Sequence, residues 1–130
     1  AKHYAAYGAA LGGLNAAPSD ISMRTMFEIY LKPWRAFANA GGRGAMASHQ
    51  TLNRVPMHAN SYLVNEIFRS RFGFGDGAIV SDCNDIGVLQ DYRIAANKSQ
   101  AAARGLIGGV DLDLVCADPS NDAIAGSYLD

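Results

Sequence analysis

Three short stretches of the sequence place polar side chains where a strand is expected to end. They are Lys2-His3, Ser48-His49-Gln50 and Ser81-Asp82-Cys83. Carboxylate, imidazole and ammonium groups can attack an electrophilic carbon, transfer protons or hydrogen-bond a ligand, so each stretch is a candidate for chemistry. The alternative is structural, because an aspartate after a strand is more often a helix cap or a turn former. Spacing alone leaves both interpretations of Asp82 open.

Short apolar runs and helical patterns would position these stretches. We expect the end of a strand within 2–7, strands over 44–48, 78–81 and 112–115, and helices over about 22–40, 61–72 and 99–107 between them. Strands that alternate with helices predict βαβ units and a parallel sheet. In enzymes of this architecture that close into a barrel, the catalytic groups lie at the carboxyl ends of the strands, where the three polar stretches fall.

The first helix carries three local signals. Ser22 is a candidate N-cap, and Pro33 should kink or restart the helix. Gly41 and Gly42 should end it. The segment from Gln50 to Asn60 and the segment over 118–122 read as loops.

The count of elements limits the fold. About four strands and three helices make roughly four βα units, whereas a complete (β/α)8 barrel of the TIM type needs about 250 residues. The chain has 130 residues, so it would form half of such a barrel. An open doubly wound sheet is the alternative, but the G-x-G-x-x-G loop that usually follows its first strand is absent from the sequence. We therefore predict an α/β fold that is a partial barrel.

Charge and hydropathy exclude several classes of function. The net charge of −1 argues against a nucleic-acid partner, and the apolar runs are far shorter than the ~20 residues of a membrane span. The first residues do not resemble a signal peptide. The two cysteines, Cys83 and Cys116, are too few for a disulfide framework, and with three scattered histidines they form no zinc pattern.

A series of motifs in fixed order resembles a known family. The motifs are Lys2-His3-Tyr4, the run from Arg24 to Trp34, Met46 to Gln50, Pro56 to Asn60, Arg69 to Phe74, Ile79 to Asp82 and Ala102 to Leu114. Each is weak alone, but their order and spacing resemble the N-terminal catalytic domain of glycoside hydrolase family 3. The resemblance implies that residues 1–130 are the carboxyl-terminal half of that domain's (β/α)8 barrel, with a second α/β domain expected in the longer chain.

The resemblance also implies an activity. The family contains retaining, exo-acting β-glucosidases and β-xylosidases, whose substrates are β-linked oligosaccharides and glycosides. Asp82 would be the nucleophile that carries the glycosyl-enzyme intermediate, and no acid/base can be assigned in this chain. The resemblance places Lys2, His3, Met46, His49 and Cys83 against the sugar. No metal or other cofactor is required, and a secreted or periplasmic location is favoured.

The sequence departs from the family pattern at three positions. Position 49 is His where the family usually has Tyr, position 50 is Gln rather than Asn, and Cys83 replaces a Trp. The Ser81-Asp82-Cys83 run looks more like the β-xylosidase side of the family. The N-acetylglucosaminidase branch is not favoured, because the loop over 4–8 lacks that branch's catalytic histidine.

Two other functions remain to be weighed. The departures at positions 49 and 83 are compatible with a sugar-binding or interaction protein whose family 3 site has decayed. An unrelated barrel such as an aldolase would need a Schiff-base lysine in a strand, but Lys32 and Lys98 fall on helical stretches. We expect the isolated 130-residue chain to be inactive, because it lacks the acid/base and half of the barrel. The sequence leaves glucoside against xyloside preference, linkage and oligomeric state open.

Overall fold

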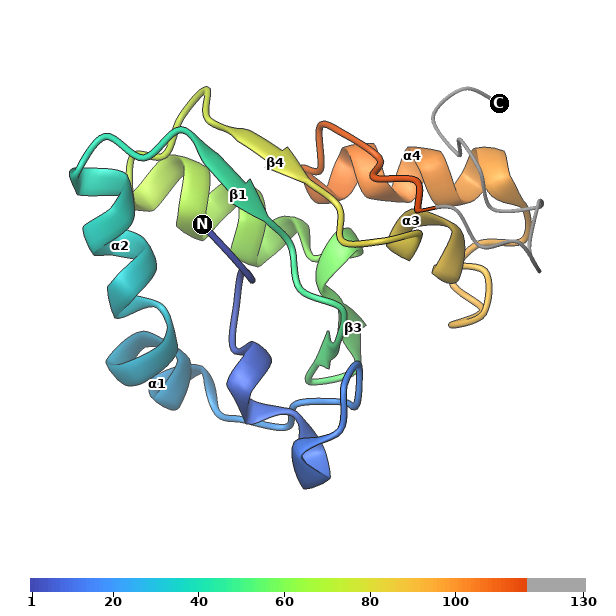
Figure 1. Ribbon diagram of the computed structural model, residues 1–130, viewed down its shortest axis with the longest axis horizontal. Coiled ribbons are helices and arrows are strands. Elements are labelled where there is room, and N and C mark those ends of the chain that lie inside the picture. The colour runs from blue at the N-terminus through green and yellow to red at the C-terminus, as the bar shows by residue number, and fades with distance from the viewer. Residues whose placement is uncertain (117–130) are drawn as a thin grey trace.

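Four chain segments lie side by side in parallel, as the sequence predicts. In the computed structural model, which describes residues 1–116, β1 (Gly44–Met46) pairs in parallel with β4 (Ala78–Val80). Single parallel bridges add one segment on each side, Tyr4 to Ala47 and Val80 to Leu112. Figure 1 shows β1 and β4 next to each other although 31 residues separate Met46 from Ala78 along the chain. An α/β arrangement with parallel strands is therefore confirmed.

The two outer segments are shorter than the predicted strands at 2–7 and 112–115. The first turns away after Tyr4, and Ala6 has a positive φ of 65°. In the last segment, around Leu112, side chains make some of the hydrogen bonds that the backbone of a regular strand would make. Asp111 accepts the Ile79 backbone N–H at 2.7 Å, and the Ser81 hydroxyl accepts the Leu114 N–H at 2.7 Å.

Helices and turns connect these segments. They are η1 (Tyr7–Ala9), η2 (Leu11–Gly13), α1 (Met23–Thr25), η3 (Met26–Tyr30), α2 (Lys32–Asn39), η4 (Met57–Ala59), η5 (Tyr62–Arg71), α3 (Asp85–Val88) and α4 (Lys98–Gly108). The Ser22 side chain accepts the Thr25 N–H, and Pro33 lies in the first turn of α2, so both predicted helix signals are confirmed. No helix within residues 1–116 has the length and apolar character needed to cross a membrane.

The structure contains a hairpin and short helices that were not predicted. The expected loop before Asn60 contains an antiparallel hairpin of β2 (Thr51–Leu52) and β3 (Val55–Pro56), followed by η4. The short helix α3 begins three residues after Asp82, in a stretch without clear apolar periodicity. The predicted loop over 118–122 lies outside the described residues.

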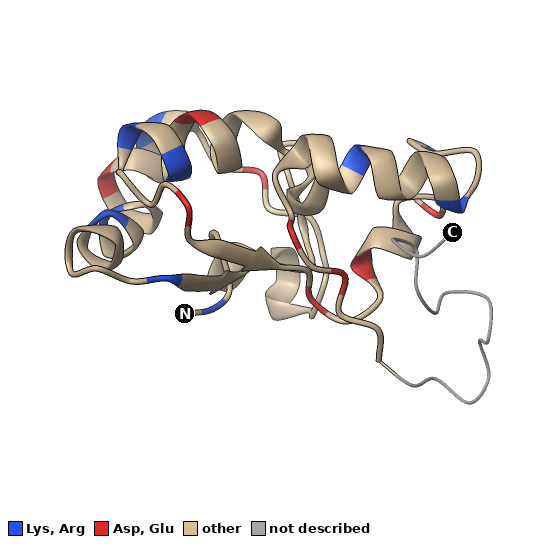
Figure 2. Ribbon diagram, turned by 90° about the horizontal axis from the view of Figure 1, so that it is seen from above, with Lys and Arg blue, Asp and Glu red and all other residues tan. Residues whose placement is uncertain are grey.

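Helices cover one face of the parallel strands, as Figure 2 shows. Ala45 and Ile79 point into the resulting core and are buried. Five rings contact one another in this core, namely Tyr4, Trp34, Phe37, Phe68 and Phe74, which we call the aromatic cluster. The opposite face carries an apolar cavity of about 350 Å³, lined by residues that include Gly44, Met46, Ala78 and Val80. The strands are thus covered on one side and open on the other.

Candidate active site

Asp82 lies where β4 ends, and it is 7% exposed. Its backbone N–H donates a hydrogen bond to Nε2 of His58 at 3.0 Å. Its Oδ1 accepts the backbone N–H of Cys83 at 2.8 Å. The main chain and one carboxylate oxygen are therefore fixed, while the second oxygen, Oδ2, is left to face other side chains.

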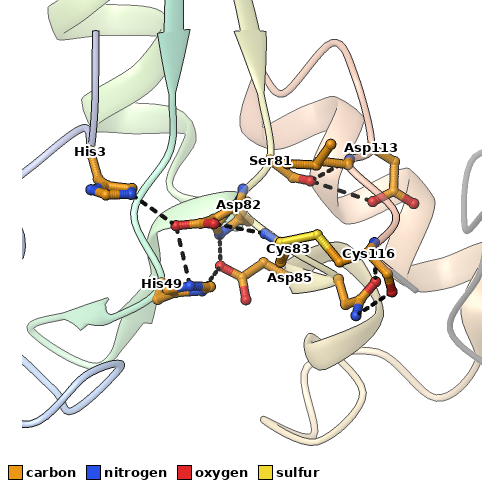
Figure 3. The surroundings of a disulfide bond; sticks show 11 residues. His3, His49, Ser81, Asp82, Cys83, Asp85, Asp113 and Cys116 are labelled. Atoms are coloured by element: carbon orange, nitrogen blue, oxygen red, sulfur yellow. Dashed lines mark hydrogen bonds and ion pairs between the residues drawn. A yellow bond between two sulfur atoms is a disulfide. The ribbon is translucent and has the colours of Figure 1, made fainter. Parts of the chain in front are cut away.

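Two histidines face Oδ2 of Asp82. Nε2 of His3 lies 3.3 Å away and Nε2 of His49 lies 3.2 Å away, as Figure 3 shows. Neither ring is aligned for a hydrogen bond, so within the described residues this buried oxygen accepts none. A buried carboxylate oxygen without an aligned donor is unusual, because burial makes a missing hydrogen bond costly. Oδ2 of Asp82 is therefore available to a ligand.

A second carboxylate, that of Asp85, lies behind His49. Oδ2 of Asp85 is 2.8 Å from Nδ1 of His49 and 3.4 Å from Nδ1 of His58. Since Nε2 of His58 accepts the Asp82 N–H, the contacts close a ring of four residues. We call Asp82, His49, Asp85 and His58, together with His3, the histidine–aspartate cluster.

Burial shifts the pKa of three members of this cluster, His58, His3 and Asp85. It lowers the pKa of His58 to about 3, so that this imidazole is neutral near pH 7. Its Nε2 is an acceptor, which assigns the remaining proton to Nδ1, the nitrogen that faces Asp85. Burial also lowers the pKa of His3, against the attraction of Asp82. It raises the pKa of Asp85, an effect that His49 opposes.

A disulfide bond between Cys83 and Cys116 flanks Asp82. Two cysteines that looked too few for a framework therefore form one cross-link, which closes a separation of 33 residues. The Asn84 side chain reinforces it, because its amide donates to the Cys116 carbonyl and accepts the Cys116 N–H. Cys83 was predicted to contact the sugar, and any such contact would involve a disulfide sulfur rather than a free thiol.

Some residues of the three polar stretches lie in the candidate site, and others hold the segments that form it. His3, His49 and Asp82 meet, as the strand ends predict. Ser48 and Gln50 instead donate to the Ala5 carbonyl, at 3.3 and 2.8 Å, and hold the amino-terminal segment in place. These supporting contacts are buried and face away from solvent.

Lys2 and Met46 lie on the open face of the strands, where both line the apolar cavity. Lys2 is exposed, and its positive charge contributes to the lowered pKa of His3. The two residues therefore lie on the side of the strands that the helices leave uncovered.

Sequence reasoning missed His58 and Asp85. The three histidines looked scattered, yet the fold brings all of them to the two carboxylates. One feature of the sequence could have indicated Asp85: it is a second carboxylate, three residues after the candidate Asp82. Within residues 1–116, no group of three or more His, Cys, Asp or Glu side chains is arranged to hold a metal ion.

Comparison with known proteins gives consistent matches. The profile of the glycosyl hydrolase family 3 N-terminal domain matches residues 1–127. A β-xylosidase from Formosa agariphila is 45% identical over 117 residues, which cover 88% of this chain and 16% of that protein. The periplasmic β-glucosidase of Salmonella typhimurium is 34% identical over 113 residues, covering 87% of this chain and 15% of that protein.

Solved structures agree with these relatives. A β-glucosidase from Erythrobacter marinus superposes with a TM-score of 0.84 at 40% identity, over 88% of this chain and 15% of the other. A β-glucosidase from Listeria innocua in complex with glucose gives a TM-score of 0.83 at 31% identity, over 87% of this chain and 16% of the other. This chain thus spans about a sixth of the length of its relatives. The predicted resemblance is confirmed, and the chain belongs to the N-terminal domain of glycosyl hydrolase family 3.

Proposed function

We propose that this chain is the nucleophile-bearing part of a retaining, exo-acting β-glycosidase. The observation that carries the proposal is Oδ2 of Asp82, a buried oxygen with no aligned donor, held between two imidazoles at the end of a parallel strand. Such an oxygen is fixed in place yet free to form a bond. Membership in a family of glycosidases supports a sugar as the partner in that bond.

The reaction has two displacements at the anomeric carbon. Oδ2 of Asp82 attacks this carbon, the bond to the glycosidic oxygen breaks, and the leaving oxygen takes a proton from an acid. Water then attacks the same carbon, loses a proton to that acid's conjugate base, and Asp82 departs as a carboxylate. The two carboxyl groups of a retaining glycosidase lie about 5–5.5 Å apart. Both glutamates of this chain, Glu28 and Glu66, lie on helices, so the acid/base comes from another part of the protein.

The remaining site residues bind the sugar. His3 and Lys2 donate to its hydroxyl groups, and His49 borders the same position through its contact with Asp82. Met46 and the disulfide sulfur of Cys83 supply apolar surface. A site built to hydrogen-bond hydroxyl groups discriminates strongly against analogues that lack them.

The open face of the strands indicates how the longer protein is built. A parallel sheet normally has both faces covered, whereas here one face carries an apolar cavity of about 350 Å³. We propose that residues 1–130 form the carboxyl-terminal half of a (β/α)8 barrel whose other strands close over this face. The acid/base would then come from a second α/β domain, and the isolated chain would be inactive.

The names of the relatives limit the substrate class. They include β-xylosidases and β-glucosidases, and structures of the Listeria innocua enzyme contain glucose, isofagomine or, in a mutant, laminaribiose. A β-glucoside or β-xyloside is therefore the expected substrate. A decayed, purely sugar-binding site is not favoured, because the relatives are named as β-xylosidases and β-glucosidases.

The proposal is tested in the full-length protein with aryl β-xylosides and β-glucosides. Asp82→Ala should lower kcat by at least about 10³-fold, as expected when a covalent nucleophile is lost. Asp91→Ala removes an exposed carboxylate nearby in the sequence and should leave kcat unchanged. Unchanged hydrolysis by Asp82→Ala would show that Asp82 is not the nucleophile.

A further inference from the structure

His49 and Asp85 make a short contact, 2.8 Å from Nδ1 to Oδ2, beside the nucleophile. We propose that Asp85 is a positioning residue, which together with His49 forms a proton-holding pair, and that loss of one proton from this pair slows attack by Asp82 at alkaline pH. The inference rests on the proposed function, since it concerns the same Asp82. It assigns a role to two residues, Asp85 and His58, that the chemistry described above does not use.

The geometry around His49 favours two protons on the pair. Its Nε2 faces Oδ2 of Asp82 at 3.2 Å, and its Nδ1 faces Oδ2 of Asp85 at 2.8 Å. A neutral imidazole has only one N–H, so with both carboxylates ionised one nitrogen would turn a lone pair toward an anionic oxygen. Two protons remove this repulsion, either as an imidazolium or as an imidazole beside a protonated Asp85. In both states Nε2, which lies 3.2 Å from Oδ2 of Asp82, carries a hydrogen that relieves the repulsion without being aligned for a hydrogen bond.

Removal of one proton changes what Asp82 faces. The shorter contact is with Asp85, so the remaining proton is retained at Nδ1. Nε2 then presents a lone pair to Oδ2 of Asp82. The repulsion pushes the attacking oxygen from its position, which is costly because reactive geometry tolerates little displacement.

Asp85 reaches Asp82 through the two histidines, and of these His49 is the one that faces the attacking oxygen. Its side chain is 8% exposed, and its Oδ2 is occupied by His49 and His58. His58 completes the ring by accepting the Asp82 N–H, so the pair and the nucleophile's main chain are fixed together. His49 itself does not fit the role of acid/base, because 3.2 Å from the nucleophile is far shorter than the ~5–5.5 Å that a sugar requires.

The other titratable groups around the pair change little between neutral and alkaline pH. Burial keeps His58 and His3 neutral by lowering the pKa of each. Burial, with Asp85 and Asp91, raises the pKa of Tyr92, which follows α3 and stays protonated. Lys2, from the amino-terminal segment, is exposed, and its charge adds to the lowering of the His3 pKa. Among the described residues that face Asp82, the His49–Asp85 pair is thus the group whose protonation would change.

The test isolates the attack of Asp82 in the full-length protein. A 2-deoxy-2-fluoro β-glycoside with a dinitrophenolate leaving group needs no protonation to depart, so its trapping rate does not involve the acid/base. The rate is measured from about pH 5 to about pH 9 for wild type, Asp85→Asn and His49→Gln. Asp91→Asn, an exposed aspartate with the same change in charge, is the matched control.

The wild-type rate should fall on the alkaline side, approaching about tenfold per pH unit, as for the loss of one proton. In Asp85→Asn, the carboxamide donates to Nδ1, because the charge of Asp82 selects the tautomer with N–H at Nε2. The alkaline fall should disappear there and in His49→Gln, but persist in Asp91→Asn. Trapping at Asp82 with the wild-type pH profile in Asp85→Asn and His49→Gln would overturn the inference. Failure to label Asp82 at all would instead overturn the proposed function.

Discussion

The aromatic cluster and the histidine–aspartate cluster are adjacent in the chain yet depend on different forces. His3 and Tyr4 are neighbours, but the first faces Asp82 and the second packs against Phe68. In the aromatic cluster, the rings of Tyr4 and Phe68 stack with centroids 4.4 Å apart, and those of Phe68 and Phe74 with centroids 4.2 Å apart. Such packing stabilises the fold because it removes apolar area from water. The ring contacts depend little on exact orientation, so small shifts in the positions of the rings cost little free energy.

The contacts of the histidine–aspartate cluster depend on the exact positions of a few polar atoms. Two carboxylates and a neutral histidine are buried, and each is held by one or two directed contacts. Burying these groups costs free energy that their contacts only partly offset. The aromatic cluster therefore stabilises the fold, whereas the histidine–aspartate cluster lowers its stability, as active sites commonly do.

The largest expected effect lies in the aromatic cluster. Phe68→Ala should destabilise the fold by about 3–5 kcal/mol, because it removes a fully buried ring at the centre of the cluster. Tyr62→Ala, on the same helix η5 but 52% exposed, should change stability by less than about 0.5 kcal/mol. Denaturant unfolding of the full-length protein measures both. Equal effects would contradict the central place given to Phe68.

The disulfide is the next largest contribution, and it supports the histidine–aspartate cluster. Replacing Cys83 and Cys116 together by Ser should cost about 3–4 kcal/mol, from the chain entropy of a loop of 33 residues. Thermal unfolding with and without a reducing agent measures this, and the double variant should no longer respond to reduction. If a reducing agent still lowered the unfolding temperature of the double variant, a bond other than Cys83–Cys116 would be responsible for the response.

His58 makes the stability depend on pH. Burial lowers its pKa from 6.5 to about 3, so between these values the unfolded chain binds a proton that the folded chain does not. Stability should therefore fall as the pH falls through this window, by at most about 1.4 kcal/mol per pH unit. Asp85 acts in the opposite direction, so the measurement is the difference between wild type and His58→Gln. That difference should shrink as the pH falls, and a constant difference would contradict a neutral, buried His58.

The smallest expected effect is a gain in stability. Burial raises the folded-state pKa of Asp85 above its ordinary value. Stability from this group is present at low pH and is lost as the pH rises through the raised pKa. Asp85→Asn should therefore stabilise the fold above that pH by about 1 kcal/mol, while altering the pH dependence of catalysis. Urea unfolding at neutral pH tests the sign, and a loss of stability would place Asp85 among the stabilising residues.

The sequence predicted the parts of the fold that depend on local chemistry. Ser22 and Pro33 act through their own side chains, and the apolar runs of β1 and β4 pair wherever a parallel sheet forms. The outer strands were overestimated, because Asp111 and Ser81 replace ladder hydrogen bonds with side-chain ones, which no periodicity reveals.

The candidate site was predictable only at the strand ends. His3, His49 and Asp82 lie at expected strand ends, so their convergence follows from the parallel sheet. His58 and the Cys83–Cys116 bond depend on contacts between segments 24 and 33 residues apart. Such contacts are set by how helices pack on the sheet, which neither composition nor spacing encodes.

The most direct test of the nucleophile is to trap it. Full-length protein is incubated with a 2-deoxy-2-fluoro β-glycoside, digested with a protease and mapped by mass spectrometry. The account predicts one added fluoroglycosyl group, located on Asp82 and absent from the Asp82→Asn variant. A label on any other residue, or an equally labelled variant, would contradict it.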